Sequence, residues 1–238
     1  MYQHILLDLD DTIFDFQAGE VYAIKRILKE FDLKDSTENI RAYNQLNKEL
    51  WKHIESGEMT KQELLQQRFP KFLAIYGITV NDNDGLAIDD QFRQYLVEGT
   101  NFMPGAEILL ENLKKLHKVS IYAATNGIGK TQRDRLEKLG LEDYFKQVYI
   151  SEEIGFNKPD ARFFEYILSD ISPAPKTKIV MIGDSLTSDM EGARRSNIDA
   201  IWFNPFKLDS NTVSNPAIVH HNSSLLGIWD FLYSEYKD

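Results

Sequence analysis

The segment Asp8–Thr12 holds three carboxylates and directly follows an apolar run that begins at Ile5. Such a run is typical of a short buried strand. Because side chains alternate along a strand, we expect Asp8 and Asp10 to share one side while Leu9 faces the core. Neighbouring carboxylates repel one another unless a cation or a shared proton relieves them, and oxygen ligands suit a hard divalent cation such as Mg²⁺. The segment therefore predicts a metal-assisted site at which an aspartate acts as nucleophile or acid–base group.

Further polar segments follow other apolar runs along the chain. Their candidate residues are Thr125 and Asn126, then Lys158, then Asp184 with Asp189. In open parallel sheets, ligands bind outside the carboxyl ends of the strands, where the strand order reverses, so these segments can converge there. Each of the later segments alone is more typical of a turn, a helix cap or a solvated loop. The specific signal is the ordered set of acids, threonine, lysine and aspartate.

The elements that must position these residues alternate between strand and helix patterns. The predicted strands are Ile5–Leu9, Val119–Ala124, Gln147–Ile150, Lys178–Ile182 and Ala200–Phe203. The predicted core helices are Pro104–Leu116, Lys130–Leu139, Ala161–Ser169 and Ser188–Ser196. Strands that alternate with helices indicate an α/β fold with a mostly parallel sheet.

One long segment, residues 16–99, shows helical periodicity and no strand pattern. Within it, Thr60 followed by Glu63 has the form of a capping box ahead of an apolar run. We therefore predict a core of residues 1–15 and 100–238, and an inserted all-helical domain of residues 16–99. The insertion is either structural elaboration or a lid, because it leaves the sheet immediately after the acidic segment.

The composition of the chain excludes some kinds of binding site and disfavours some classes of binding partner. The chain has 238 residues, 42% of them hydrophobic, with no cysteine and a formal net charge of −10. Disulfides and thiolate metal sites are excluded, and nucleic acid and anionic membrane surfaces are disfavoured as partners. No N-terminal signal and no apolar run of membrane-spanning length is visible, so we expect a cytoplasmic protein. The oligomeric state stays open.

These motifs together resemble the haloacid dehalogenase-like superfamily in its phosphatase form. The matching residues are Asp8, Asp10 and Thr12 for the first motif, Thr125 for the second, Lys158 for the third, and Asp184 and Asp189 for the fourth. The dehalogenases of this superfamily lack the second aspartate, so Asp10 argues for phosphate chemistry. The resemblance implies a Rossmann-like parallel sheet with strand order 3-2-1-4-5 and an inserted all-helical cap domain.

The resemblance also implies a role for each acid. Asp8 would attack phosphorus and form an aspartyl-phosphate. Asp10 would protonate the leaving oxygen and then activate water. Mg²⁺ would be held by the Asp8 carboxylate, the backbone carbonyl of Asp10, and Asp184. Asp189 would orient either Lys158 or a metal-bound water.

The remaining family positions would receive the phosphate. Thr125 and the backbone of Asn126 would bind phosphate oxygens, and Lys158 would neutralise charge near the nucleophile. A cationic pocket of this kind would let an acidic protein accept a small anionic substrate.

A narrower resemblance is to the bacterial house-cleaning pyrimidine 5′-nucleotidases of the superfamily. It is carried by Asn44–Trp51, Gly57, Thr60, Gln67–Phe69, Gln132, Arg135 and Ser151–Gly155. It implies a nucleoside monophosphate substrate, for which Trp51 could stack on the base and Arg68 could meet a polar edge. The alternative for both residues is a place in the domain's own core.

Two other functions stay open from the sequence. A sugar-phosphate or phosphoglycolate phosphatase would share the same core motifs. A phospho-accepting signalling module also groups aspartates, a threonine or serine, and a lysine around Mg²⁺. The order of the motifs, the helical insertion and the length of the chain all disfavour the signalling module.

Overall fold

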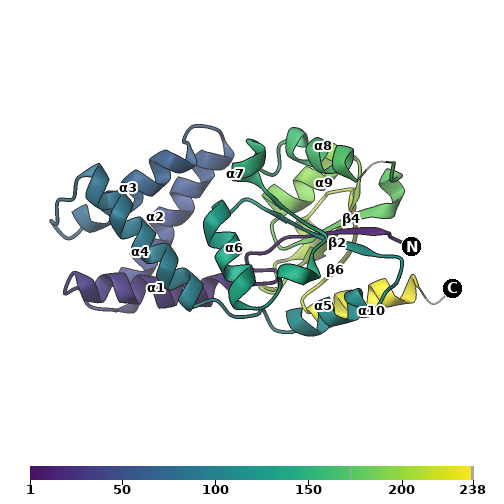
Figure 1. Ribbon diagram of the computed structural model, residues 1–238. Helices are drawn as coiled ribbons and strands as arrows, with labels where there is room; N and C mark the ends of the chain where they lie inside the picture. The colour runs from purple at the N-terminus through teal and green to yellow at the C-terminus, as the bar shows by residue number, and fades with distance from the viewer. Residues whose placement is uncertain (172, 237–238) are drawn as a thin grey trace. The chain divides into compact units, whose positions relative to one another are not determined.

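The computed structural model describes residues 1–171 and 173–236. The chain forms two compact units, one made of Met1–Asp15 with Asn101–Asp238 and the other of Phe16–Thr100 (Figure 1). We call these the core unit and the helical unit. Within the described residues, no helix combines the length and apolar composition that crossing a bilayer requires.

The core unit is built on a parallel sheet of six strands in the order β3-β2-β1-β4-β5-β6. The strands are β1 (His4–Leu7), β2 (Ser120–Thr125), β3 (Gln147–Ile150), β4 (Ile179–Gly183), β5 (Asp199–Phe203) and β6 (Ile218–Asn222). The predicted α/β class and the order 3-2-1-4-5 are confirmed, and β6 is an additional edge strand beside β5. Its sequence escaped prediction because two histidines interrupt the apolar pattern of Ile218–Asn222.

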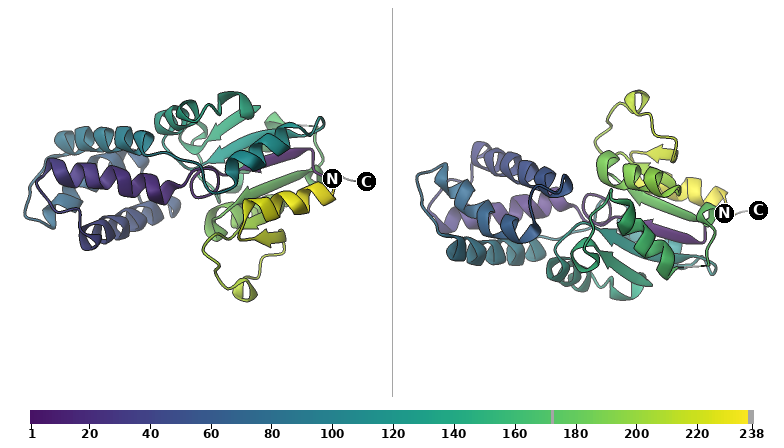
Figure 2. Two further views of the ribbon diagram at one scale, coloured as in Figure 1. Left: turned by 90° about the horizontal axis from the view of Figure 1, so that it is seen from below. Right: turned by 90° about the horizontal axis from the view of Figure 1, so that it is seen from above.

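Helices cover both faces of this sheet (Figures 1 and 2). One apolar cluster packs the sheet against α5 (Ala106–Lys114), α6 (Gly129–Lys138) and α10 (Leu225–Ser234). The other packs the opposite face against α8 (Ala161–Asp170) and α9 (Glu191–Ser196). The short helix α7 (Ser151–Ile154) directly follows β3. Burial on both faces explains why the central strands are continuous apolar runs rather than alternating ones.

The central strand β1 is shorter than predicted. Its last residue is Leu7, and Asp8 continues the ladder only through its N–H, which donates to the Ile182 carbonyl over 2.9 Å. The Leu9 carbonyl then accepts from the N–H of Phe14 over 2.8 Å, which closes a turn. Leu9 is buried as predicted, but Asp8 and Asp10 do not lie on one continuous strand.

The predicted helix Ser188–Ser196 is divided in the structure. A π-helical turn, η3 (Leu186–Met190), comes first, and α9 begins at Glu191. The turn holds Asp189 almost fully buried at 1% exposure. The candidate acid Asp189 therefore lies on a turn that is wider than a turn of α-helix. Regular α-helical periodicity in a sequence does not predict such a turn.

The helical unit contains four α-helices. They are α1 (Phe16–Glu30), α2 (Thr37–Glu55), α3 (Lys61–Ala74) and α4 (Asp82–Glu98). The capping box predicted at Thr60 and Glu63 is confirmed at the start of α3. Asn81 caps α4 by accepting from the N–H groups of Asn83 and Asp84, each over 3.0 Å. The unit has its own apolar core, which includes Tyr43, Phe69, Phe72 and Phe92.

Candidate active site

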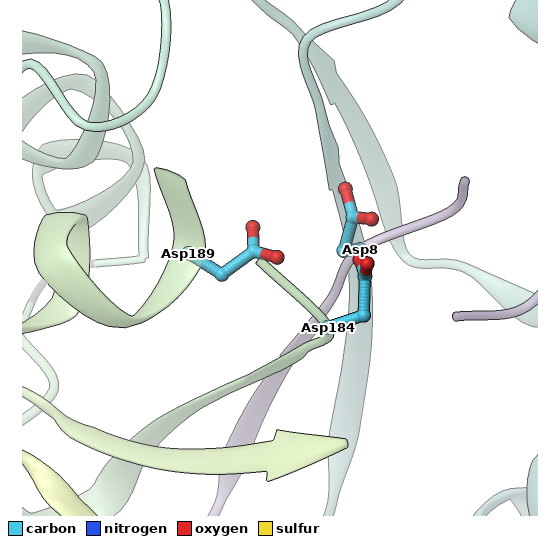
Figure 3. Close-up of side chains that lie close together, drawn as sticks. All are labelled: Asp8, Asp184 and Asp189. Atoms are coloured by element: carbon cyan, nitrogen blue, oxygen red, sulfur yellow. The ribbon is translucent and has the colours of Figure 1, made fainter. Parts of the chain in front are cut away.

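Three of the predicted acids meet at the carboxyl ends of the central strands. The strand order reverses between β1 and β4, and Asp8 and Asp184 directly follow these two strands. Asp189 reaches toward them from the π-helical turn η3 (Figure 3). One carboxylate oxygen from each of the three residues lies within 4.8 Å of the others. The sheet thus brings together acids that are far apart in the sequence, at the position where α/β sheets bind ligands.

Lys158 binds this acidic cluster. Its side chain is 2% exposed, and Nζ donates to Asp8 Oδ1 over 2.5 Å, to Asp189 Oδ1 over 2.7 Å and to the Ala124 carbonyl over 2.6 Å. An ammonium group has three donors, and here each of them has an acceptor. A buried lysine with two carboxylate partners is a fixed positive charge beside Asp8.

The amide side chain of Asn126 holds the backbone of the lysine. Asn126 Oδ1 accepts from the N–H of Lys158 over 2.8 Å, and Asn126 Nδ2 donates to the carbonyl of Lys158 over 2.9 Å. Both polar ends of this side chain are therefore engaged with the loop between α7 and α8. Any contact of Asn126 with a phosphate would come from its backbone, as the resemblance implies.

Burial and like charge dominate the electrostatics of the cluster. Burial raises the pKa of Asp8, and the carboxylates of Asp189 and Asp10 raise it further while Lys158 opposes them. Burial also raises the pKa of Asp184 well above its usual value, with Asp8 and Asp189 adding to the shift. Burial alone would lower the pKa of Lys158, but Asp189 and Asp8 outweigh it and raise that pKa. The acids are thus held in an environment that resists their negative charge.

This donor set fits a divalent cation. The carboxylates of Asp8, Asp184 and Asp189 lie close together, and the ammonium of Lys158 pairs with two of them, so full ionisation of the four groups leaves two negative charges uncompensated. Oxygen donors close together with excess negative charge are what Mg²⁺ prefers. The side chain of Asp10 is engaged elsewhere, so its share in such a site is limited to the backbone carbonyl that the resemblance implies.

A glycine makes room for Asp189. A Cβ atom added at Gly183 would lie 2.2 Å from Asp189 Oδ2, far inside contact distance. The same oxygen accepts from the N–H of Ser185 over 3.1 Å, while the other carboxylate oxygen faces Lys158. The glycine before Asp184 in the fourth motif therefore has a packing reason, because it lets Asp189 reach the lysine.

Thr125 ends β2 and is 1% exposed. Its Oγ1 accepts from the N–H of Gly127 over 3.2 Å and from Gln132 Nε2 over 2.8 Å. A hydroxyl has two acceptor lone pairs and one proton. Because both lone pairs are in use, the proton of Thr125 is left to be donated, which suits a phosphate oxygen.

Asp10 lies outside the acidic cluster and contacts α6 instead. Its side chain is 31% exposed, and Oδ2 accepts from Gln132 Nε2 over 2.9 Å. Its other oxygen, Oδ1, accepts from Nη1 of Arg135. Gln132 and Arg135 were among the residues that carry the narrower resemblance, but no role was predicted for either of them. Their signal in the sequence is two long polar residues that lie three apart on a predicted helix.

The two candidates in the helical unit belong to its interior. Arg68 is 4% exposed, and its Nε and Nη2 donate to Asp89 Oδ1 over 2.9 and 2.5 Å. Its Nη1 donates to Asn47 Oδ1 over 3.1 Å. Trp51 is partly buried against the cluster of Leu50, Ile54 and Leu64. Both residues therefore contribute to packing within the helical unit.

The chain matches the haloacid dehalogenase-like hydrolase family over residues 5–203 and belongs to that family. It is an enzyme of the hydrolase class. The match spans the four sequence motifs and the helical unit between the first two of them.

Individual relatives cover most of the chain. Pyrimidine 5′-nucleotidase PynA of Streptococcus pneumoniae is 40% identical over 90% of this chain and 89% of its own length. Pyrimidine 5′-nucleotidase YjjG of Escherichia coli is 30% identical, over 84% of this chain and 85% of its own. The crystal structure of the HAD-hydrolase YfnB of Bacillus subtilis, bound to magnesium, superposes with a TM-score of 0.84 at 33% identity, covering 97% of this chain and 98% of that one.

Proposed function

We propose that the protein is a Mg²⁺-dependent phosphomonoester hydrolase that acts through an aspartyl-phosphate, with pyrimidine nucleoside monophosphates as its substrates. The observation that carries the proposal is the buried Lys158, which binds Asp8 and Asp189 beside Asp184 at the switch point of the sheet. The names of the relatives PynA and YjjG support the nucleotide substrate.

In the first step, a carboxylate oxygen of Asp8 attacks phosphorus and the ester P–O bond breaks. Asp10 gives its proton to the departing oxygen, so that the nucleoside leaves as a neutral alcohol. Lys158 stays charged beside the nucleophile, and the Thr125 hydroxyl donates to a phosphoryl oxygen. This arrangement stabilises the negative charge that spreads over the transferring group.

In the second step, water attacks the phosphorus of the aspartyl-phosphate. Asp10, now a carboxylate, takes a proton from that water, and the bond between phosphorus and the Asp8 oxygen breaks. Phosphate leaves and both aspartates return to their starting states. Mg²⁺ held by Asp8, Asp184 and the Asp10 carbonyl would supply positive charge to the phosphoryl oxygens throughout.

The test of this function is phosphate release from a panel of dUMP, UMP, dTMP, sugar phosphates and phosphoglycolate, each with Mg²⁺ and with EDTA. We expect Mg²⁺-dependent release led by the pyrimidine nucleotides. Release led by a sugar phosphate or phosphoglycolate would keep the mechanism and replace the substrate. No release from any compound in the panel would overturn the phosphatase assignment.

We also propose that the helical unit, which begins directly after Asp15 and ends at Thr100, is a cap domain. The support is its insertion point in the chain, directly after the segment that carries Asp8 and Asp10. Lids of this kind exclude water from reacting groups. We expect small-angle scattering profiles to change when Mg²⁺ and a phosphate mimic are added together, and matching profiles would contradict closure.

A further inference from the structure

Helix α6 presents two buried polar side chains to Asp10. Gln132 and Arg135 are each 1% exposed and lie one turn apart. We propose that both are positioning residues, which hold the Asp10 carboxyl for proton transfer and aim the Thr125 hydroxyl at the phosphate. The inference rests on the proposed function, because it concerns how that site is kept in order.

The chemistry of the neighbours determines the orientation of the Gln132 amide. Arg135 can only donate, and its Nη1 donates to Gln132 Oε1 over 2.9 Å. A carboxyl oxygen that carries no proton can only accept, and Asp10 Oδ2 accepts from Gln132 Nε2 over 2.9 Å. The reverse orientation would face donor to donor and acceptor to acceptor. The second proton of Nε2 is therefore committed to Thr125 Oγ1, at 2.8 Å.

The guanidinium of Arg135 is fixed by its surroundings. Its Cζ lies 4.4 Å from the ring centroid of Phe14, a fully buried residue that follows the acidic segment. Its Nη1 contacts both Asp10 and Gln132. A side chain packed on an aromatic face and held by two acceptors keeps one rotamer, so the carboxyl that it contacts also keeps one.

A glycine keeps the space that Gln132 occupies. A Cβ atom added at Gly127 would lie 2.5 Å from Gln132 Nε2 and 2.6 Å from its Cγ. Gly127 belongs to the turn after Thr125, so the side chain of Gln132 packs directly against the backbone of that turn. Gly127→Ala therefore displaces Gln132 without removing a polar group.

The positions of the contacts distinguish the two residues. Both residues contact Asp10 and each other, but only Gln132 contacts Thr125, and Asp10 and Thr125 still hold Gln132 when Arg135 is lost. Loss of Arg135 should therefore impair proton transfer and leave phosphate binding largely intact. Loss of Gln132 should impair both, because the Thr125 hydroxyl loses one of the groups that aim it.

The experiment compares Arg135→Met and Gln132→Leu with Arg133→Met, an exposed control on the same helix that pairs with Glu153. Each full-length variant is assayed with dUMP and with p-nitrophenyl phosphate, whose leaving group departs without a proton. Rapid-mixing kinetics records the first turnover, and acid quenching measures the phosphoenzyme. Thermal unfolding reports whether each variant folds, and Arg135→Lys serves as the conservative variant.

We expect Arg135→Met to lower kcat for dUMP by about 100-fold, a typical contribution of acid–base catalysis, with little change in KM. With p-nitrophenyl phosphate, it should still release a first equivalent of nitrophenolate rapidly and then accumulate phosphoenzyme, because only the later water attack needs Asp10. Gln132→Leu and Gly127→Ala should raise KM as well, and Arg135→Lys should recover part of kcat.

The positioning proposal is overturned when Arg135→Met folds and keeps the kcat of Arg133→Met, or when both reaction steps slow equally and no phosphoenzyme accumulates. If Arg135→Met does not fold, the same measurements of kcat, first turnover and phosphoenzyme on Arg135→Lys and Gly127→Ala test the positioning proposal instead. Failure of the proposed function itself is recognised separately, because the unsubstituted protein would then release no phosphate from either compound.

Discussion

At the scale of single residues, the site is a balance between buried charges. Burial and neighbouring carboxylates raise the pKa of Asp8 and of Asp184, and the ammonium of Lys158 offsets only part of each shift. Removing one partner of a buried ion pair usually costs more than the pair contributes, because the other charge is left alone. Single substitutions in this cluster should therefore change catalytic activity and the free energy of unfolding by different amounts.

Asp8→Asn removes the proposed nucleophile while keeping the shape of the side chain. We expect phosphate release to fall at least about 1,000-fold, because an amide does not form the acyl phosphate. The unfolding midpoint in EDTA should stay the same or rise, since one buried negative charge is gone while Lys158 keeps its ion pair with Asp189. A steady-state assay and thermal unfolding check both parts, and substantial remaining activity would exclude Asp8 as the nucleophile.

At the scale of elements, close backbone approach depends on small residues. Gly85 lies inside α4, and a Cβ atom added there would be 2.5 Å from the Gln66 carbonyl oxygen and from Pro70 Cγ, both in α3. The polar stretch Asn81–Gly85 forms the start of α4, with Asn81 as its N-cap. Its glycine lets α3 and α4 pack closely.

Gly85→Ala tests this contact. Helix propensity alone would favour alanine by about 1 kcal/mol, but overpacking typically costs about 1–3 kcal/mol. We expect the free energy of unfolding of the helical unit to fall. The matched control is Asn83→Ala, an exposed position in the same helix, where only propensity acts. Chemical denaturation of both variants measures the difference, and a stabilised Gly85→Ala protein would disprove the close contact.

At the scale of the whole molecule, a metal site couples cation binding to folding. A ligand that binds only the folded state adds about 2.7 kcal/mol at a concentration one hundred times its dissociation constant. The formal net charge of −10 adds a general attraction for cations, which salt screens. The specific and general effects can therefore be separated by ionic strength.

We expect MgCl₂ to raise the unfolding midpoint more than a potassium salt of equal ionic strength does. Asp184→Asn should lose most of this difference, because one of the clustered carboxylates is gone. In EDTA, the same variant should be at least as stable as the unsubstituted protein, since repulsion within the cluster is reduced. Differential scanning calorimetry checks each case, and an equal Mg²⁺ effect in both proteins would place the cation elsewhere.

Much of the fold could be predicted because burial leaves a local pattern. The runs around Leu7, Ala123 and Ile182 are apolar because the central strands are covered on both faces. The end of β1 was less predictable, since Leu9 is equally apolar but its carbonyl closes a turn. The edge strand β6 was missed because its side chains alternate between half-buried and exposed positions.

The sequence by itself determined the family motifs and the helical nature of the insertion, because each depends on residues close together in the chain. The order of the central strands was predicted only through the resemblance that those motifs carry. Only the tertiary structure decided that Lys158 contacts both Asp8 and Asp189, and that Asp10 contacts Gln132 and Arg135 rather than the acidic cluster. These partners lie 31 to 150 residues apart in the sequence. The spacing of residues along the chain does not predict which of these side chains are in contact, because the contacts depend on how strands and helices pack.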